Sequence, residues 1–231
     1  MLKLNHTFFN ISHLFDDQIT ALLSRRISLD NPKIITDNRE QLARKAGFNP
    51  QYLAIPHQVH SDIVQWIDKA GNYPNTDSLI TDNHEVVLTL QVADCVPVYL
   101  FDKITKTRAL VHAGWRGVVS NIVSKTTELM IEKGCNPKDI KVFCGPSIQQ
   151  CCYEVNENVA KQFSDKSVVQ FGDKFRVNLT MEIKQQLLNL DILDANIYQS
   201  SYCTYESEIC HSYRRDGEKS ARMIALFGEI G

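Results

Sequence analysis

Three short apolar runs in the middle of the chain constrain its fold more than any other feature. They are Val86–Val92, Val96–Phe101 and Ala109–Val111, which are rich in β-branched residues and are separated by segments typical of turns. Runs of this length between turns are typical of strands buried inside a protein. We therefore expect adjacent buried strands at the centre of the fold.

Helical patterns surround these strands in the sequence. Apolar residues recur at helical spacing over 118–130, before Gly134, and again over 179–192. A capping box of Asp37 and Glu40 followed by Gly47 predicts a short helix near the N-terminus. Further strands are expected at Ile140–Phe143, 197–202 and 223–227. These elements predict an α/β (mixed α+β) fold, a mixed β-sheet packed with helices.

Length and composition limit the classes of protein that fit. The 231 residues contain 43% hydrophobic residues and no repeat or linker, so we expect one domain over 1–231. The net charge of −2 and the dispersed basic residues argue against a nucleic-acid partner. No apolar stretch reaches the roughly 18 residues that cross a bilayer, and no signal peptide is evident. We expect a cytoplasmic protein without a membrane partner, whose seven cysteines are reduced.

Candidate ligands of a transition metal occur in three segments, His57–His60, Ala93–Pro97 and Val111–Gly117. Each segment places a nitrogen or sulfur donor at the end of an expected strand. Catalytic zinc uses three protein ligands and keeps a fourth position open, so His60, Cys95 and His112 satisfy the count. Their spacing matches no compact zinc-finger pattern, and a lone buried His or Cys more often serves packing. From the residues alone the metal site is a hypothesis.

A longer series of motifs, over about residues 37 to 228, resembles the YfiH/YlmD family, also called the laccase-domain or polyphenol oxidase family. Several separated matches in the family's order are far more specific than one short motif. The matching segments are His57–His60, Thr76–Thr81, Thr89–Pro97, His112–Gly117, Gly145–Ile148 with Cys151–Val155, Tyr202–Thr204 and Ser212–Gly217.

This resemblance implies a YfiH-like laccase domain and a zinc ion on the matching His60, Cys95 and His112. It also implies a purine nucleoside phosphorylase, which converts adenosine, inosine, guanosine or methylthioadenosine and phosphate to the free base and ribose 1-phosphate. Deamination of adenosine is implied as a further activity. The expected partners are therefore small molecules, a purine nucleoside and phosphate.

Copper chemistry is an alternative that the family's older label suggests. A multicopper oxidase needs several copper centres and roughly ten His ligands, whereas this chain has seven His. One His/Cys site can still bind copper in place of zinc. Copper-dependent oxidation of polyphenols remains an open alternative.

Candidate catalytic and substrate residues lie near the expected ligands. Arg116, between Gly114 and Gly117 before a helix, is our choice to bind phosphate. The His-x-Glu and Pro-Cys-x-x-Cys signatures of nucleobase deaminases are absent, so Asp94 is the candidate for moving protons. We expect His57 to support His60 or contact substrate, and Arg214 and Arg215 to lie in a substrate loop.

Two other classes of function remain open. In a Cys/His hydrolase or deamidase, Cys95 would be a thiolate nucleophile activated by His112 instead of a metal ligand. A non-enzymatic binding module would tolerate Cys95→Ala.

Cysteines outside the three donor segments could form a second thiolate site, although no Cys-x-x-Cys motif is present. These are Cys144, Cys151, Cys152, Cys203 and Cys210. A loop near the pocket is the preferred interpretation of Cys144–Ser147. The chain also departs from the family pattern at three places. No Gly-rich loop is found between Phe15 and Pro32, Cys210–His211 replaces an aromatic pair, and Ser220–Arg222 lacks a glycine before the arginine. These differences leave the shape of the pocket, and so the preferred purine, open.

Overall fold

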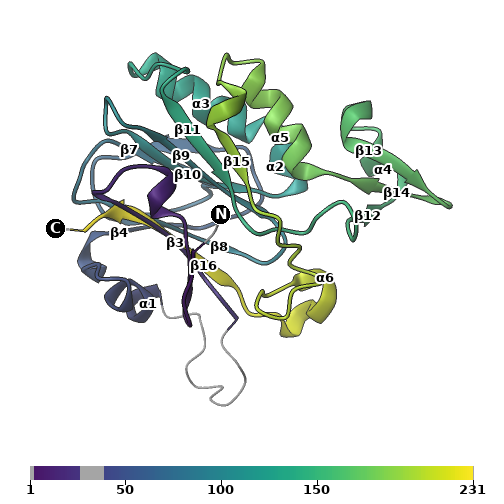
Figure 1. The fold of residues 1–231 in the computed structure, drawn as a ribbon, viewed down its shortest axis with the longest axis horizontal. Helices are drawn as coiled ribbons and strands as arrows, with labels where there is room; N and C mark the ends of the chain where they lie inside the picture. The colour runs from purple at the N-terminus through teal and green to yellow at the C-terminus, as the bar shows by residue number, and fades with distance from the viewer. Residues whose placement is uncertain (1–2, 27–38, 231) are drawn as a thin grey trace.

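Two mixed β-sheets form the centre of the molecule in a computed structural model that describes residues 3–26 and 39–230 (Figure 1). The first sheet is antiparallel from β1 to β8 and parallel from β8 to β6. Its strands, in spatial order, are β1 (Lys3–Leu4), β2 (Phe8–Asn10), β3 (Ile19–Ser24), β16 (Met223–Glu229), β8 (Val87–Val92), β4 (Leu53–Pro56) and β6 (Gly71–Tyr73).

The second sheet has parallel pairs at both edges and an antiparallel centre. Its strands, in spatial order, are β15 (Ile197–Gln199), β11 (Ile140–Cys144), β9 (Val96–Asp102), β10 (Arg108–Ala113), β7 (Ser78–Thr81) and β5 (Val64–Trp66). A small antiparallel sheet lies to one side, with β12 (Glu154–Val155), β14 (Lys174–Val177) and β13 (Val168–Phe171).

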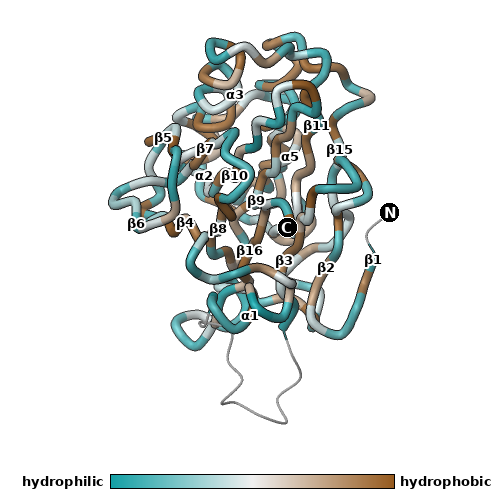
Figure 2. The backbone as a smooth tube through the Cα atoms, turned by 90° about the vertical axis from the view of Figure 1, so that its left-hand side faces the viewer, coloured by the Kyte–Doolittle hydropathy of each residue, from teal (hydrophilic) through white to brown (hydrophobic). Residues whose placement is uncertain are grey.

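The central strands are mostly apolar because both faces of each sheet are covered. In β9, Val98 and Leu100 pack toward the helices, whereas Tyr99 and Phe101 pack between the two sheets. This division follows from the alternation of side chains along a strand. Figure 2 shows the result, because hydrophobic residues concentrate in the strands and hydrophilic residues in the outer loops.

Helices cover the outer faces of the two large sheets (Figure 1). The helices α2 (Trp115–Val119), α3 (Ile122–Glu132) and α5 (Leu179–Leu188) share a core with the second sheet. Helix α1 (Arg39–Lys45) packs on the first sheet. The short helices α4 (Glu157–Ala160) and α6 (Tyr213–Asp216) accompany the small sheet and the C-terminal segment. None of these described helices has the length and apolar character to cross a membrane.

The observed elements confirm the mixed α/β class, and most expected strands and helices are present. The structure differs from three of the expectations. The strands divide between sheets, so that β8 is not hydrogen-bonded beside β9, although the two are consecutive in the chain. The helix expected over 118–130 is two helices, because Asn121 adopts a left-handed conformation with φ 61°. Helix α5 ends at Leu188, before Ile192. The expected cap Asp37 lies outside the described residues.

Candidate metal centre

Three donor side chains converge where the chain passes between the two large sheets. His60 lies in the loop from β4 to β5, Cys95 in the turn from β8 to β9, and His112 in β10. Their ligand atoms all lie within 4.8 Å of one another, and the two imidazole centroids are 4.7 Å apart. The structure thus brings together the residues that the sequence offered as metal ligands.

Asp77, which is fully buried, holds two of these donors in place. Its Oδ1 lies 2.7 Å from Nδ1 of His112 and accepts the backbone N–H of His60 at 3.1 Å. Its Oδ2 accepts the N–H and the hydroxyl of Ser61, both at 2.7 Å. The carboxylate favours a proton on Nδ1 of His112, which leaves Nε2 as the metal-binding nitrogen.

The charges in this group favour metal binding. Burial raises the pKa of the Cys95 thiol, but His112 and His60 outweigh it and the pKa is lowered to about 6. Burial lowers the pKa of His112, but Cys95 and Asp77 raise it overall to about 9. Despite burial, hydrogen bonds from His112 and Ser61 lower the pKa of Asp77 to about 2. A thiolate is the form of Cys that binds metal, so Cys95 is ready as a ligand near neutral pH.

Backbone geometry permits this close approach. A Cβ at Gly114 would lie 3.0 Å from Sγ of Cys95 and 3.1 Å from Cδ2 of His60. His60 and Asp94 both have positive φ, 59° and 84°, so the loop and the turn that carry the donors are bent sharply. Strained backbone of this kind concentrates at functional sites.

A cavity of about 1060 Å³ opens beside the three donors. Its described lining contains cationic, aromatic and polar side chains, and His60, Cys95 and His112 form part of its surface. The other lining residues are Arg39, Ile55, Pro56, His57, Gln58, Asn72, Tyr73, Pro74, Gln91, Ala93, Asp94, Tyr153, Tyr213, Arg214 and Arg222. A pocket of this size accommodates a small organic molecule.

Asp94 lines the cavity, and both of its carboxylate oxygens accept hydrogen bonds. Oδ1 accepts the hydroxyl of Thr204 and Oδ2 accepts the backbone N–H of Arg214, each at 2.6 Å. The carbonyl of Asp94 accepts the N–H of Ile148 at 3.0 Å. Asp94 therefore joins the turn that carries Cys95 to three other segments.

Of the four remaining candidate residues, two line the cavity and two lie outside its described lining. His57 and Arg214 both line the cavity. Arg116 is exposed, and its guanidinium carbon lies 4.4 Å from the centroid of the Trp115 ring, outside the described lining. Arg215 donates to the carbonyls of residues 204, 205, 207 and 210 and to Asp216, so it holds the 204–210 loop together.

Sequence reasoning assigned no role to Asp77, Tyr153 or Arg222. Asp77 and Tyr153 lie inside motifs that matched the family, yet only the folded chain shows that Asp77 contacts His112 and that Tyr153 faces the cavity. Arg222 stood out in the sequence only as a departure from the family pattern. It enters the cavity beside Tyr213, with its guanidinium carbon 5.6 Å from the ring centroid.

The donor set suits zinc. Two imidazoles and one thiolate match the nitrogen and sulfur ligands of catalytic zinc sites, and a buried carboxylate behind a ligand His is their usual support. Copper accepts the same donors, so the residues alone do not select between the two metals.

Comparison with known proteins agrees with these features. A family model described as "Multi-copper polyphenol oxidoreductase laccase" matches residues 22–228. A purine nucleoside phosphorylase of Clostridium acetobutylicum is 33% identical and covers 91% of this chain and 92% of its own. One from Borreliella burgdorferi is 29% identical over 93% and 94% of the two chains. The crystal structure of YlmD from Geobacillus stearothermophilus superposes with a TM-score of 0.90, at 25% identity, over 100% of this chain and 99% of that chain.

Proposed function

This chain belongs to the multi-copper polyphenol oxidoreductase laccase family, and we propose that within it the protein is a zinc-dependent purine nucleoside phosphorylase. The observation that carries the proposal is the cavity itself, in which three metal donors, arginines and tyrosines share one surface. Relatives named purine nucleoside phosphorylase match nearly the whole chain, which supports an enzyme of this kind.

Phosphorolysis forms a bond from a phosphate oxygen to C1′ of the ribose and breaks the bond from C1′ to the purine nitrogen. The departing purine takes the bonding electrons and a proton. The cavity must therefore hold an anion beside the sugar, and Arg39, Arg214 and Arg222 supply positive charge there. Guanidinium groups fork onto phosphate oxygens, so we assign phosphate binding to these arginines in place of Arg116.

The purine needs a flat surface and polar partners. Tyr73, Tyr153 and Tyr213 line the cavity and offer aromatic rings for stacking. Arg214 and Arg222 lie over the rings of Tyr153 and Tyr213, with guanidinium carbons 5.3 and 5.6 Å from the centroids. These contacts place the positive charges next to the aromatic surface, as a phosphate next to a nucleoside requires.

We assign the metal to His60, Cys95 and His112. When bound there, zinc would supply a Lewis acid to the reaction. The chain's own part is to orient these donors through Asp77 and to bring the substrate beside them. A single centre of this kind offers no multicopper relay, so we rank copper-dependent polyphenol oxidation below phosphorolysis.

Asp94 acts in this account as a positioning residue. Its two oxygens accept hydrogen bonds from the hydroxyl of Thr204 and the backbone N–H of Arg214, so the carboxylate ties these two segments to the turn that carries Cys95. The side chain thereby sets the cavity wall that contains Arg214.

Adenosine, inosine, guanosine and methylthioadenosine are the proposed substrates, since all carry a purine on a ribose. Deamination of adenosine, in which water replaces the 6-amino group and ammonia leaves, is a proposed second reaction of the same cavity. His57, which lines the cavity, is a proposed contact to the nucleoside.

A Cys/His hydrolase is the second candidate, and the charge state of Cys95 favours it. A thiolate at Cys95, a cationic His112 and the orienting Asp77 resemble a nucleophile, a base and its support. His60 is the discriminating residue, because a nucleophile needs no second imidazole within 4.8 Å of its sulfur. Three converging donors therefore favour the metal.

The test is chromatographic analysis of inosine and adenosine incubated with zinc-loaded protein, with and without phosphate. We expect free base and ribose 1-phosphate only when phosphate is present, and a higher KM for phosphate in Arg222→Met than in Arg116→Met. Base release without phosphate, or no release at all while an ester or amide is cleaved, would overturn the assignment in favour of the hydrolase.

A further inference from the structure

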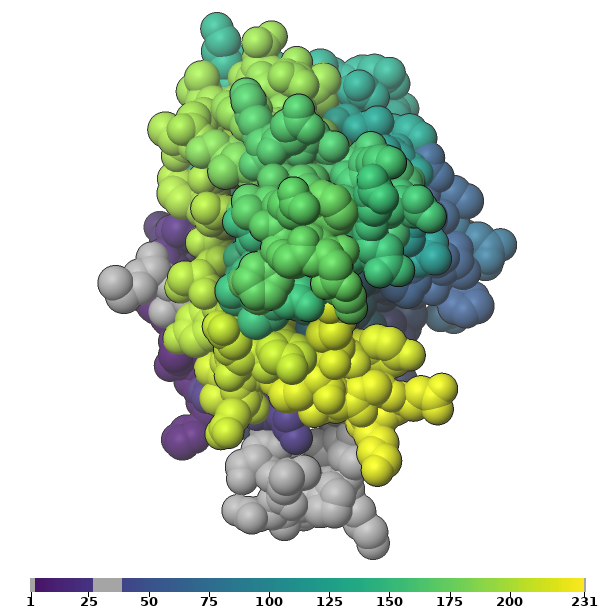
Figure 3. Space-filling model, turned by 90° about the vertical axis from the view of Figure 1, so that its right-hand side faces the viewer, coloured from purple at the N-terminus to yellow at the C-terminus, as the bar shows by residue number. Residues whose placement is uncertain are grey.

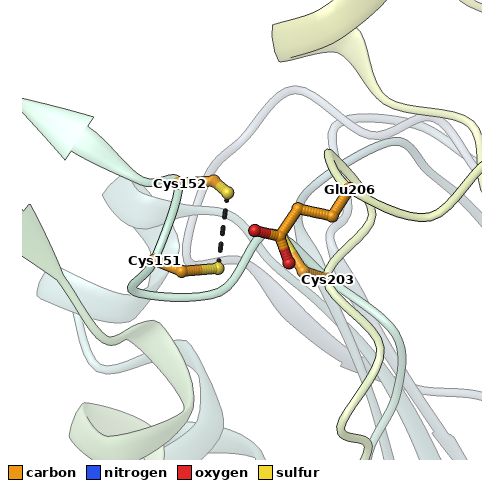
Figure 4. A group of neighbouring side chains, drawn as sticks. All are labelled: Cys151, Cys152, Cys203 and Glu206. Atoms are coloured by element: carbon orange, nitrogen blue, oxygen red, sulfur yellow. Dashed lines mark hydrogen bonds between the residues drawn. The ribbon is translucent and has the colours of Figure 1, made fainter.

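A second group of metal-binding side chains lies outside the cavity. Cys151, Cys152, Cys203 and Glu206 have ligand atoms that all lie within 4.8 Å of one another. Figure 4 shows the two sulfurs of Cys151 and Cys152 on one turn, 3.3 Å apart, facing Cys203 and the carboxylate of Glu206 on another. The two turns are about fifty residues apart in the sequence, so only the fold brings these groups together.

Local hydrogen bonds shape both turns. The carbonyl of Gln149 accepts the N–H of Cys152 at 3.0 Å, and the carbonyl of Cys203 accepts the N–H of Ser207 at 2.9 Å. The second bond places Cys203 and Glu206 on one side of a single turn, in a Cys-x-x-Glu arrangement. Zinc sites commonly take two ligands from such a spacing.

The sulfur of Cys203 already accepts a hydrogen bond from the backbone. The N–H of Gln149 lies 3.5 Å from its Sγ, and that amide belongs to the turn that carries Cys151 and Cys152. Backbone N–H donors to sulfur support thiolate ligands and fix their direction. Cys203 is also buried, whereas Cys151 and Glu206 reach the surface, so a metal ion has a path to the group.

We propose that Cys151, Cys152, Cys203 and Glu206 form a second, structural site for a zinc ion. The dimensions agree, because zinc–sulfur bonds of about 2.3 Å in a tetrahedron place the sulfurs roughly 3.8 Å apart. The Cys151–Cys152 separation of 3.3 Å and the 4.8 Å limit for the whole group bracket that value. Four protein ligands close the coordination shell, which is the mark of a structural site.

The kinds of donor in the group indicate which metal it would bind: three cysteine sulfurs and one carboxylate converge there. Thiolates and one carboxylate suit zinc, and the carboxylate oxygen makes the group less suited to Cu(I), which prefers sulfur. Zinc binding here releases protons from the thiols.

The site would fasten one wall of the cavity. Tyr153 directly follows Cys152, and Thr204, which holds Asp94, directly follows Cys203. Figure 3 shows the segment around 150–177 lying against the C-terminal segment near 205–222. A zinc ion would link these two segments next to Thr204, whose hydroxyl donates to Asp94 in the turn that carries Cys95.

Cobalt titration tests the proposal independently of any turnover. Reduced, metal-free protein is titrated with Co²⁺ alone, and the sulfur-to-cobalt absorption is followed, because its intensity rises with the number of thiolate ligands. We expect two equivalents in the unmodified chain. In Cys95→Ala, which removes a ligand of the first site, we expect one equivalent that keeps most of the absorption.

Variants of the cluster separate its ligands from a general effect on folding. In the Cys95→Ala background, Cys151→Ser and Glu206→Gln, both at exposed positions, are expected to weaken cobalt binding at least tenfold. Cys135→Ser, at a thiol outside both clusters, is the matched control and should bind as before. A Cys95→Ala protein that binds no cobalt, or a disulfide from Cys203 to Cys151 or Cys152 in protein kept under reductant, would overturn the proposal.

Discussion

At the scale of single residues, the buried carboxylate of Asp77 connects the fold to the proposed metal centre. It accepts hydrogen bonds from the loop that carries His60 and contacts the ring of His112, so one side chain orients two of the three donors. His60 reaches the site from the loop that joins the two sheets and His112 from a strand of the second sheet, and Asp77 fixes their relative position. The donors are thus arranged before a metal arrives.

Replacing Asp77 by Asn should weaken metal binding while leaving the three ligands in the chain. The amide cannot accept the bonds of Ser61 and His112 together, because one of its ends carries hydrogens. We expect zinc affinity to fall about 10- to 100-fold, measured by competition with a chelating dye. Asp62→Asn, in the same loop but paired with Lys125, is the control and should keep its affinity. Equal affinity in both variants would refute the role of Asp77.

The metal-free protein should show a pH dependence set by Cys95 and His112. The pKa of Cys95 is lowered from 9.0 to about 6, so its stabilising charge is lost as the pH falls through about 6. The pKa of His112 is raised from 6.5 to about 9, so its contribution is lost as the pH rises through about 9.

The charged pair therefore persists between about pH 6 and pH 9, and metal-free protein should be most resistant to urea in that window. Alkylation of Cys95 by iodoacetamide should accelerate as the pH rises through about 6, and zinc should protect the thiol. An alkylation midpoint near pH 9 would contradict the ion pair.

At the scale of elements, the connections between the two large sheets carry the donors. The turn from β8 to β9 and the loop from β4 to β5 each leave the first sheet and enter the second. Gly114, directly after β10, lets Cys95 and His60 approach the backbone closely. The site is therefore built from the ends of strands, where the sheets fix the chain on both sides.

Gly114→Ala should disturb the centre through crowding. The added methyl would lie 3.0 Å from Sγ of Cys95, so the sulfur must shift, and we expect weaker zinc binding together with a loss of about 1–3 kcal/mol in unfolding free energy. Gly228→Ala is the matched control, because its methyl would lie equally close to Val87 in β8. Zinc titration and urea unfolding of both variants should show similar destabilisation but weaker binding only in Gly114→Ala.

Sequence patterns predicted where the strands and helices lie better than they predicted which strands are hydrogen-bonded neighbours. The runs that became β8, β9 and β10 are recognisable because buried strands are apolar on both faces, but a short apolar run looks the same in either sheet. The sequence therefore placed β8 beside β9, although their connection crosses between sheets. The three candidate ligands could be proposed from the sequence because each lies in a local motif, and the structure brings their donor atoms within 4.8 Å of one another. Asp77 and Arg222 were assigned no role, because their contacts depend on distant segments.

At the scale of the whole molecule, two sheets and two helical layers share three apolar cores. The core between the sheets contains aromatic pairs such as Tyr99 with Phe227, whose centroids are 5.4 Å apart. The proposed metal centre lies where the chain crosses between these sheets. The segments that carry the candidate ligands are therefore also the segments that join the two packed sheets.

Tyr99→Phe tests the link between the sheets. The buried hydroxyl of Tyr99 in β9 donates to the carbonyl of Leu22 in β3 at 2.8 Å. We expect its removal to lower the unfolding free energy by about 1 kcal/mol, with unchanged zinc affinity. Tyr52→Phe, at an exposed tyrosine, should change neither quantity in urea unfolding or zinc titration. A loss of zinc binding in Tyr99→Phe would mean that the centre depends on sheet packing more than the geometry indicates.

The most direct test of the account is zinc reconstitution of metal-free protein, with inosine phosphorolysis measured at each level of bound zinc. Cys151→Ser is titrated in parallel, so that zinc at the second cluster is separated from zinc at the cavity. We predict that activity rises in proportion to occupancy of the His60–Cys95–His112 site and that Cys95→Ala stays inactive. Full activity in metal-free protein or in Cys95→Ala would contradict the account.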